Sequence, residues 1–129
     1  LESYLVPFQK IIEDDTTVAI MTAHILIPKV DSKIATLSPK FLGGILREQM
    51  GFNGVIITDE LEMVSAGRSV ENLAVETVKA GTDIIISTYT PEKQTLIFNK
   101  LKEAVLGGEI LEKRIDESVV RILKLKSII

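Results

Sequence analysis

The sequence predicts an α/β fold built on a parallel sheet. Three short apolar runs are typical of strands, at Val18–Ala23, Val55–Thr58 and Asp83–Ser87, and helical patterns lie between and around them. Strands that alternate with helices usually pair in parallel through right-handed crossovers. Within the second run, Val55–Ile57 shows no alternation of apolar and polar residues, which indicates a strand buried on both faces.

Three strands make a small parallel sheet. Its two outer strands would each expose an apolar edge, and proteins normally cover or close such edges. The 129 residues suit one domain with a modest core, and no linker, low-complexity tract or short repeat divides them. We therefore expect part of a larger closed sheet rather than a complete small fold.

Composition excludes several classes of function. A hydrophobic content of 46% is typical of a globular domain, and no apolar run is long enough for a membrane span. The net charge of -3 is spread along the chain, so we expect no nucleic-acid partner. Without cysteine and with a single histidine, disulfides and His-rich or thiolate metal sites are excluded. We expect no metal and no cofactor, although carboxylates could still hold a hard cation.

The N-terminal residues bear on location. Leu1–Leu5 is too short, and lacks the basic start, for a secretory signal peptide. This slightly favours a cytoplasmic location. The chain begins with Leu1 rather than Met, so the compartment stays open.

Two helices are predicted in the first half of the chain. The second is expected to start at Ser38, a capping hydroxyl before Pro39, and to end at Gly51. Between strand and helix, the polar residues of Asp31–Ser38 predict a loop. The first helix is predicted from apolar residues at helical spacing, namely Tyr4, Leu5, Phe8, Ile11 and Ile12.

Three further helices are predicted in the second half. One covers about Val70–Ala80, with Gly81 as its stop. The next opens at Thr90–Pro91 and is broken at Gly107–Gly108. Asp116 is expected to cap the last helix, which carries Lys and Arg toward its C-terminal end, where they favour the helix dipole.

Several charged residues are expected to have structural or solvent roles. Asp83 lies at the amino end of the third strand, the side of a parallel barrel associated with stability rather than chemistry. Arg47–Glu48 is expected to form a solvated ion pair or one at the bottom of the barrel. Glu62 is expected to face solvent. The charges of Lys113–Lys126 are expected to form one exposed helix face.

Asp59 is the leading candidate for chemistry. It follows the buried second strand in the step Thr58–Glu60, and α/β proteins place functional groups at the carboxyl ends of their strands. The structural alternative is that Asp59 simply caps the segment that follows. Because adjacent strand residues point to opposite faces, Glu60 is expected to face outward.

Five segments of the chain together carry a family resemblance. They are IMTAHILIP (Ile20–Pro28), DSKIATLSP (Asp31–Pro39), LREQMGFNGVIITDELEM (Leu46–Met63), VKAGTDIIIST (Val78–Thr88) and RIDESVVRILKLK (Arg114–Lys126). In the order and spacing of these segments, the chain resembles the C-terminal half of the catalytic barrel of glycoside hydrolase family 3, most closely its bacterial β-N-acetylhexosaminidase branch. The resemblance implies a (β/α)₈ TIM barrel, of which residues 1–129 would form a C-terminal portion with the last three strands.

The resemblance also implies a reaction. Asp59 matches the family's nucleophile, which would attack a β-linked N-acetylglucosamine and retain its configuration by double displacement. Cell-wall fragments or chito-oligosaccharides are the implied carbohydrate substrates. His24 matches a position that borders the sugar pocket, although a lone His is more often packed and hydrogen-bonded. Met63 could rest on the apolar face of the sugar, although Met near a strand end is more often core packing.

The chain departs from the family pattern in one important respect. The family's acid/base histidine lies in a motif resembling KH-x-PGHG, which is absent here, and His24 is not in that context. We therefore expect the chain alone to be inactive. The alternative is a non-catalytic half-barrel module that pairs its open strand edges with another copy or with a missing N-terminal half. A phosphate-binding domain is disfavoured because no glycine-rich strand–helix turn is present.

A smaller departure from the family pattern is Glu60, at a position where the family commonly has a second Asp.

Overall fold

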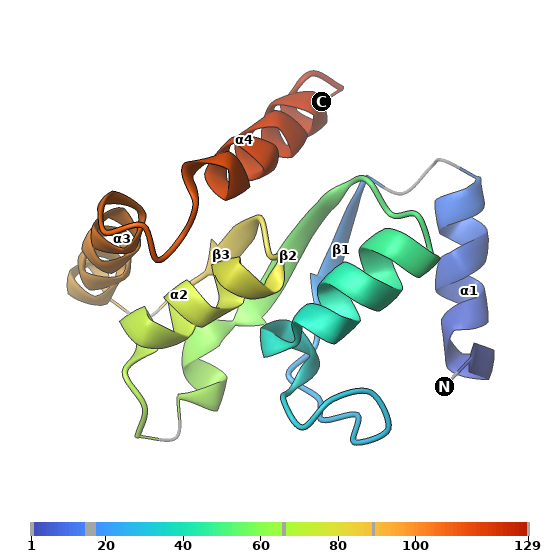
Figure 1. The fold of residues 1–129 in the computed structure, drawn as a ribbon, viewed down its shortest axis with the longest axis horizontal. Helices are drawn as coiled ribbons and strands as arrows, with labels where there is room; N and C mark the ends of the chain where they lie inside the picture. The colour runs from blue at the N-terminus through green and yellow to red at the C-terminus, as the bar shows by residue number, and fades with distance from the viewer. Residues whose placement is uncertain (1, 15–17, 66, 89, 129) are drawn as a thin grey trace.

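The computed structural model describes residues 2–14, 18–65, 67–88 and 90–128. Figure 1 shows a small sheet with helices packed around it. None of the described helices is both long and apolar enough to cross a bilayer. The elements in chain order are α1 (Glu2–Glu13), β1 (Ala19–Thr22), η1 (Ala35–Leu37), η2 (Lys40–Gln49), β2 (Val55–Glu60), η3 (Leu61–Val64), α2 (Val70–Ala80), β3 (Ile84–Ile86), α3 (Pro91–Leu106) and α4 (Glu112–Lys126).

The sheet confirms the predicted α/β class and the three predicted strands. Strand β2 is central and pairs in parallel with both neighbours, in the order β1-β2-β3. The register with β1 runs from Ala19 opposite Val55 to Thr22 opposite Thr58. Strand β2 extends two residues beyond the predicted end, so Asp59 is still part of the strand. Each outer strand keeps one edge unpaired within the described sheet.

The apolar core lies on the side of the sheet that η2 and α2 cover. Ile56 of β2 is fully buried in a cluster with Leu42, Leu46 and Phe52, against which α1 packs through two partly buried side chains. A second cluster joins η3, α2 and α3, and a third joins α2, α3 and the start of α4. On β1, by contrast, Met21 remains 61% exposed. The sheet is therefore covered well around β2 and poorly around β1.

The predicted start and stop residues account for several helix ends. The Ser38 hydroxyl accepts a hydrogen bond from Phe41 N–H at 3.0 Å, and the Thr90 hydroxyl accepts one from Lys93 N–H at 3.3 Å. Gly81 ends α2 with φ at 127°, a conformation that a side chain would strain. These three ends confirm the capping roles expected from the sequence.

The expected start of the last helix is wrong. Helix α4 begins at Glu112, so Asp116 lies within it rather than at its cap. The Leu111 carbonyl already accepts from Arg114 N–H at 2.8 Å, which closes the first turn before Asp116 is reached. This earlier start places Arg114 in the first turn, where it can reach the sheet.

A buried carboxylate at the amino end of β3 joins the sheet to its helices. The Asp83 side chain is completely buried and accepts hydrogen bonds from Ile56 N–H at 2.9 Å and from Ser118 Oγ at 2.6 Å. Its oxygens also pair with three guanidinium groups, from Arg47 at 2.7 Å, Arg121 at 3.0 Å and Arg114 at 3.4 Å. The structural role expected for Asp83 is thereby confirmed.

This cluster corrects two expectations. Arg47 pairs with Asp83 rather than with its neighbour Glu48, because the guanidinium turns inward and also donates to the Phe52 and Gly54 carbonyls at 2.8 and 2.6 Å. Burial lowers the pKa of Arg47 to about 10 despite the opposing pull of Asp83, so the group stays charged at neutral pH. The charges of Lys113–Lys126 are likewise not all exposed, since the two arginines of α4 turn toward Asp83.

We expect Asp83→Asn to lower the free energy of unfolding by about 3 kcal/mol, because it leaves three partly buried guanidinium groups without a countercharge. Urea denaturation followed by circular dichroism measures this loss. Glu109→Gln is the matched control, since it breaks only the exposed Lys79–Glu109 pair and should cost less than about 1 kcal/mol. Equal effects of the two substitutions would contradict the role given to Asp83.

Candidate functional site

Asp59 lies at the carboxyl end of the central strand and is half-buried. Its Oδ1 accepts a hydrogen bond from Glu60 N–H at 2.7 Å, which holds the carboxylate against its own backbone. Its Oδ2 has no hydrogen-bond partner among the described residues. One oxygen of Asp59 is therefore fixed while the other remains available to a ligand.

Glu60, rather than Asp59, caps the segment that follows the strand. Its Oε1 accepts from Glu62 N–H at 3.2 Å and so caps η3, while its Oε2 accepts from the Thr88 hydroxyl at 3.1 Å. The expectation that Glu60 simply faces outward is therefore wrong, because its side chain folds back onto the following turn and the segment after β3. This arrangement weakens the reading of Asp59 as a mere cap.

His24 lies just beyond the carboxyl end of β1 and is held at both ring nitrogens. Nδ1 is 2.9 Å from the Thr36 hydroxyl, and Nε2 is 3.0 Å from the Glu60 carbonyl oxygen. The structure thus brings His24 into contact with the residue that follows Asp59. Thr36, which no local pattern marks as functional, is completely buried beneath the ring.

Two side chains of η3 bear on the expectations for the segment after Asp59. Met63 is 68% exposed on η3, so it does not belong to the packed core, and contact with a sugar stays a prediction. Glu62 was expected to face solvent, but its side chain is only 5% exposed. It turns inward because its Oε2 pairs with Lys93 Nζ of α3 at 2.6 Å, while the buried Oε1 has no partner among the described atoms.

The segment between β1 and η2 is stabilised by one carboxylate. Asp31 accepts from Ser32 N–H and from the Ser38 hydroxyl, both at 2.7 Å. The hydrogen bond from Ser38 is the main reason that the pKa of Asp31 lies below its ordinary value. Ser38 therefore links the loop to the helix start, since the same hydroxyl caps η2.

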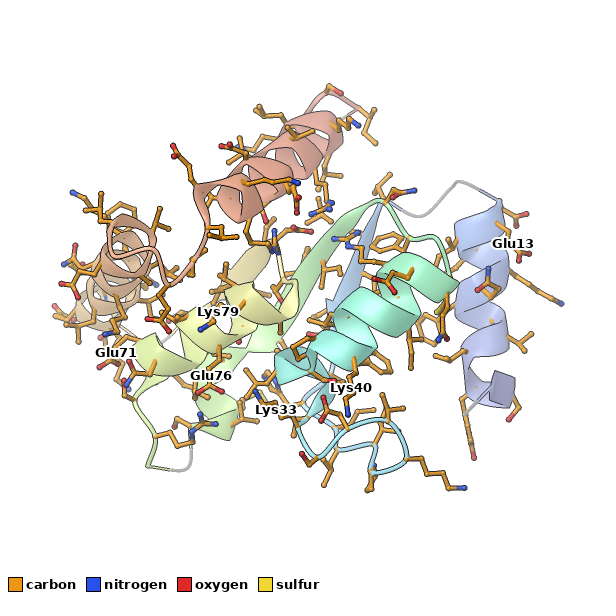
Figure 2. The ribbon with its side chains drawn as sticks, viewed as in Figure 1. Glu13, Lys33, Lys40, Glu71, Glu76 and Lys79 are labelled. Atoms are coloured by element: carbon orange, nitrogen blue, oxygen red, sulfur yellow. The ribbon has the colours of Figure 1, made fainter. Side chains whose placement is uncertain are left out.

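Charged side chains of both signs lie around η2 and α2. Figure 2 labels Lys33 and Lys40 near η2, and Glu71, Glu76 and Lys79 on α2. Among the described residues, no three His, Cys, Asp or Glu side chains come together as metal ligands. The features that favour a ligand are therefore those at the carboxyl ends of the strands.

Comparison with known proteins decides the family. Residues 1–125 match the model described as the glycosyl hydrolase family 3 N terminal domain. The chain belongs to glycosyl hydrolase family 3. The resemblance found in the sequence is thereby confirmed. The open parallel sheet with its helices matches part of an α/β barrel, which also confirms the predicted fold class.

Relatives within the family have related but different names. The chain is 41% identical over 91 residues to a β-hexosaminidase of Methylobacillus flagellatus, an alignment that covers 69% of this chain and 26% of that protein. A structure of a family 3 β-N-acetylglucosaminidase from Paenibacillus sp. str. FPU-7 matches with a TM-score of 0.90 and 42% identity, over 95% of this chain and 24% of the other. A β-glucoside phosphorylase matches with a TM-score of 0.84 and 31% identity, over 96% and 24%. The chain thus spans about a quarter of the length of each.

We expect Ser38→Ala to lower the free energy of unfolding by about 1 kcal/mol, because η2 loses its capping hydroxyl. The pKa of Asp31 should rise toward 3.8, since the main hydrogen bond that lowers it is lost. A carboxylate whose pKa is lowered in the folded state stabilises the fold above its unfolded pKa, and this stabilisation is lost as the pH falls through the folded pKa. The difference in unfolding free energy between the unmodified protein and Ser38→Ala should therefore become smaller in acid. NMR titration of the Asp31 carboxyl carbon measures the shift.

The control for this change is Ser32→Ala, because Ser32 contributes its backbone N–H and not its hydroxyl to Asp31. This variant should leave the Asp31 titration and the stability nearly unchanged. If Ser38→Ala titrates like the unmodified protein, the hydrogen bond does not govern Asp31.

Proposed function

We propose that residues 1–129 are a C-terminal portion of the catalytic barrel of a retaining β-N-acetylhexosaminidase, with Asp59 as its nucleophile. The observation that carries the proposal is the position of Asp59 at the end of the central strand, with no hydrogen bond to Oδ2 from any residue that the structure describes. The names of the relatives support hydrolysis of β-linked N-acetylglucosamine. The phosphorylase among the solved structures indicates that this part of the fold does not by itself select water as the acceptor.

The reaction requires an ionised and rigidly held carboxylate. Asp59 Oδ2 would attack the anomeric carbon, the bond to the leaving oxygen would break, and the sugar would be held as an ester of Asp59. Water would then attack the same carbon and release the sugar with retained configuration. The hydrogen bond from Glu60 N–H to Oδ1 would orient the carboxylate.

The remaining predicted site residues would shape the carbohydrate pocket. Met63, exposed on η3, offers an apolar surface to a sugar ring. His24 would line the pocket with its ring rather than bind through a nitrogen, since both nitrogens already have partners. A proton donor for the leaving group would come from outside this chain, because the motif that supplies it in the family is absent here. Its loss alone typically costs 10²–10⁴-fold in rate.

We expect Asp59→Asn to lower hydrolysis of a chromogenic N-acetylglucosaminide by roughly 10³-fold or more, because an amide cannot form the ester intermediate. The assay uses the longest active polypeptide that contains this chain. Asp116→Asn is the matched control, as it makes the same chemical change on the exposed face of α4 and should keep full activity. Activity that survives Asp59→Asn would remove Asp59 as nucleophile.

The alternative function, a half-barrel that associates through its open edges, is favoured by two apolar grooves. One, of about 470 Å³, lies beside β1 and is lined by Tyr4, Phe8 and Met21 among others. The other, of about 540 Å³, lies beside β3 between α3 and α4 and is lined by Phe98 and Val119 among others. All five of these side chains are at least 45% exposed. Each groove therefore flanks an unpaired strand edge.

The occupant that we propose for both grooves is the remainder of a closed barrel. Further strands would complete the hydrogen bonds of β1 and β3, and their helices would cover the apolar side chains. The three strands described here and the quarter of the relatives' length that the chain spans support this proposal. Pairing with a second copy of the same chain is the competing outcome. Under either outcome, the isolated chain would not hydrolyse substrate.

We expect the isolated 129-residue chain to hydrolyse no chromogenic N-acetylglucosaminide and to self-associate, because two apolar grooves stay uncovered. Size-exclusion chromatography with light scattering measures the association. Phe98→Ser should weaken it, whereas Leu106→Ser on the same helix should not, since Leu106 is 79% exposed but lies outside both grooves. A monodisperse monomer at high concentration would contradict the proposed open edges.

A further inference from the structure

The hydrogen bonds of His24 define its tautomer. The Glu60 carbonyl oxygen can only accept, so Nε2, at 3.0 Å, must carry the proton. In a neutral ring Nδ1 is then an acceptor, and the Thr36 hydroxyl at 2.9 Å must donate to it. The ring thus passes a hydrogen bond from Thr36 to the backbone beside Asp59.

The hydroxyl of Thr36 has one proton and three neighbours. Besides His24 Nδ1, it lies 3.2 Å from the Ala23 carbonyl and 3.2 Å from the Thr22 hydroxyl. The distance to Nδ1 is the shortest of the three. The Thr22 hydroxyl lies 3.4 Å from the Ile57 carbonyl and 3.2 Å from Thr36, so the shorter contact lets it donate to Thr36 and complete the acceptor side of that hydroxyl. Both threonines are buried, at 5% and 0% exposure, so water does not compete. The donors therefore run in one direction, from Thr22 through Thr36 and His24 to Glu60.

This chain of hydrogen bonds ends on the carbonyl of Glu60, the residue that follows Asp59. The N–H of Glu60 holds Asp59 Oδ1, its carbonyl is held by His24, and its side chain is held by Thr88. Glu60 is consequently bound through backbone and side chain to the ends of all three strands. Any tilt of its backbone would move the Asp59 carboxylate with it.

We propose that His24 is a positioning residue, which fixes the Asp59 carboxylate through the Glu60 backbone and is itself set by Thr36. The proposal rests on the proposed function, because it assigns His24 to the orientation of the nucleophile. Positioning by His24 would affect the transition state more than the affinity for the sugar, since a misplaced nucleophile lowers the rate of attack while the pocket still binds the sugar. Loss of the hydrogen bond should therefore appear in kcat rather than in KM.

The tautomer can be tested without any activity. The chain has a single histidine, so ¹⁵N labelling of histidine and long-range ¹H–¹⁵N NMR report on His24 alone. We expect one signal of a protonated nitrogen, at Nε2, and one of an unprotonated nitrogen, at Nδ1. Thr36→Val, which keeps the shape but removes the hydroxyl, should bring the two shifts closer, and Thr36→Ser should retain their separation.

Thr77→Val is the matched control. Thr77 is completely buried, and its hydroxyl has no hydrogen-bond partner among the described atoms, so this change removes no bond to the network. It should leave the His24 signals unchanged. A proton on Nδ1, or averaged nitrogen shifts in the unmodified chain, would overturn the proposal even if every variant fails to fold.

Kinetics of the longest active polypeptide that contains this chain test the positioning role. Thr36→Val should lower kcat by roughly 10-fold and leave KM within about 2-fold, and Thr36→Ser should recover most of the loss. A raised KM with unchanged kcat would mean that His24 acts on sugar binding, and would overturn the proposal. Full activity of Asp59→Asn would instead refute the proposed function, whatever the tautomer of His24.

Discussion

The central strand β2 is held at both of its ends by buried polar contacts, and the other features of the sheet depend on this. At its amino end, the Asp83 carboxylate accepts a hydrogen bond from Ile56 N–H and forms ion pairs with guanidinium groups of η2 and α4. At its carboxyl end, His24 binds the Glu60 carbonyl. Parallel neighbours hold the strand on either side. A buried carboxylate is tolerated only when its partners are in place, so Asp83 also determines where those helices lie.

This double attachment bears on the role proposed for Asp59, because a nucleophilic carboxylate must be both rigid and available. The strand and the hydrogen bond from Glu60 N–H supply rigidity, while Glu60 itself caps η3 and binds Thr88. Glu60 thus makes the structural contacts, and Asp59 Oδ2 has no hydrogen-bond partner within the described part of the chain. Rigid placement of a group at a strand end is the general advantage of α/β sites, because the backbone there is ordered before any ligand arrives.

Periodicity and capping residues predicted the strands, most helix ends and the position of Asp59, since these depend on neighbours within a few residues. The errors at Glu62 and Arg47 share one cause. Glu62 turns inward toward Lys93, and Arg47 toward Asp83, through partners 31 and 36 residues away in the sequence. No local pattern reveals a partner that only the crossover of the chain brings close. The error at Asp116 is local, because the helix already begins with the turn at Leu111.

The sequence by itself determined the α/β class and the family, and it singled out Asp59 as the candidate carboxylate, because apolar runs, punctuating residues and ordered segments are local or linear properties. Only the tertiary structure decided which polar groups meet. It placed His24 and Thr36 beneath the backbone of Glu60, and it buried Asp83 among three arginines. Such contacts follow from the register of parallel strands and the packing of helices across them, and these are set by the whole chain rather than by any segment.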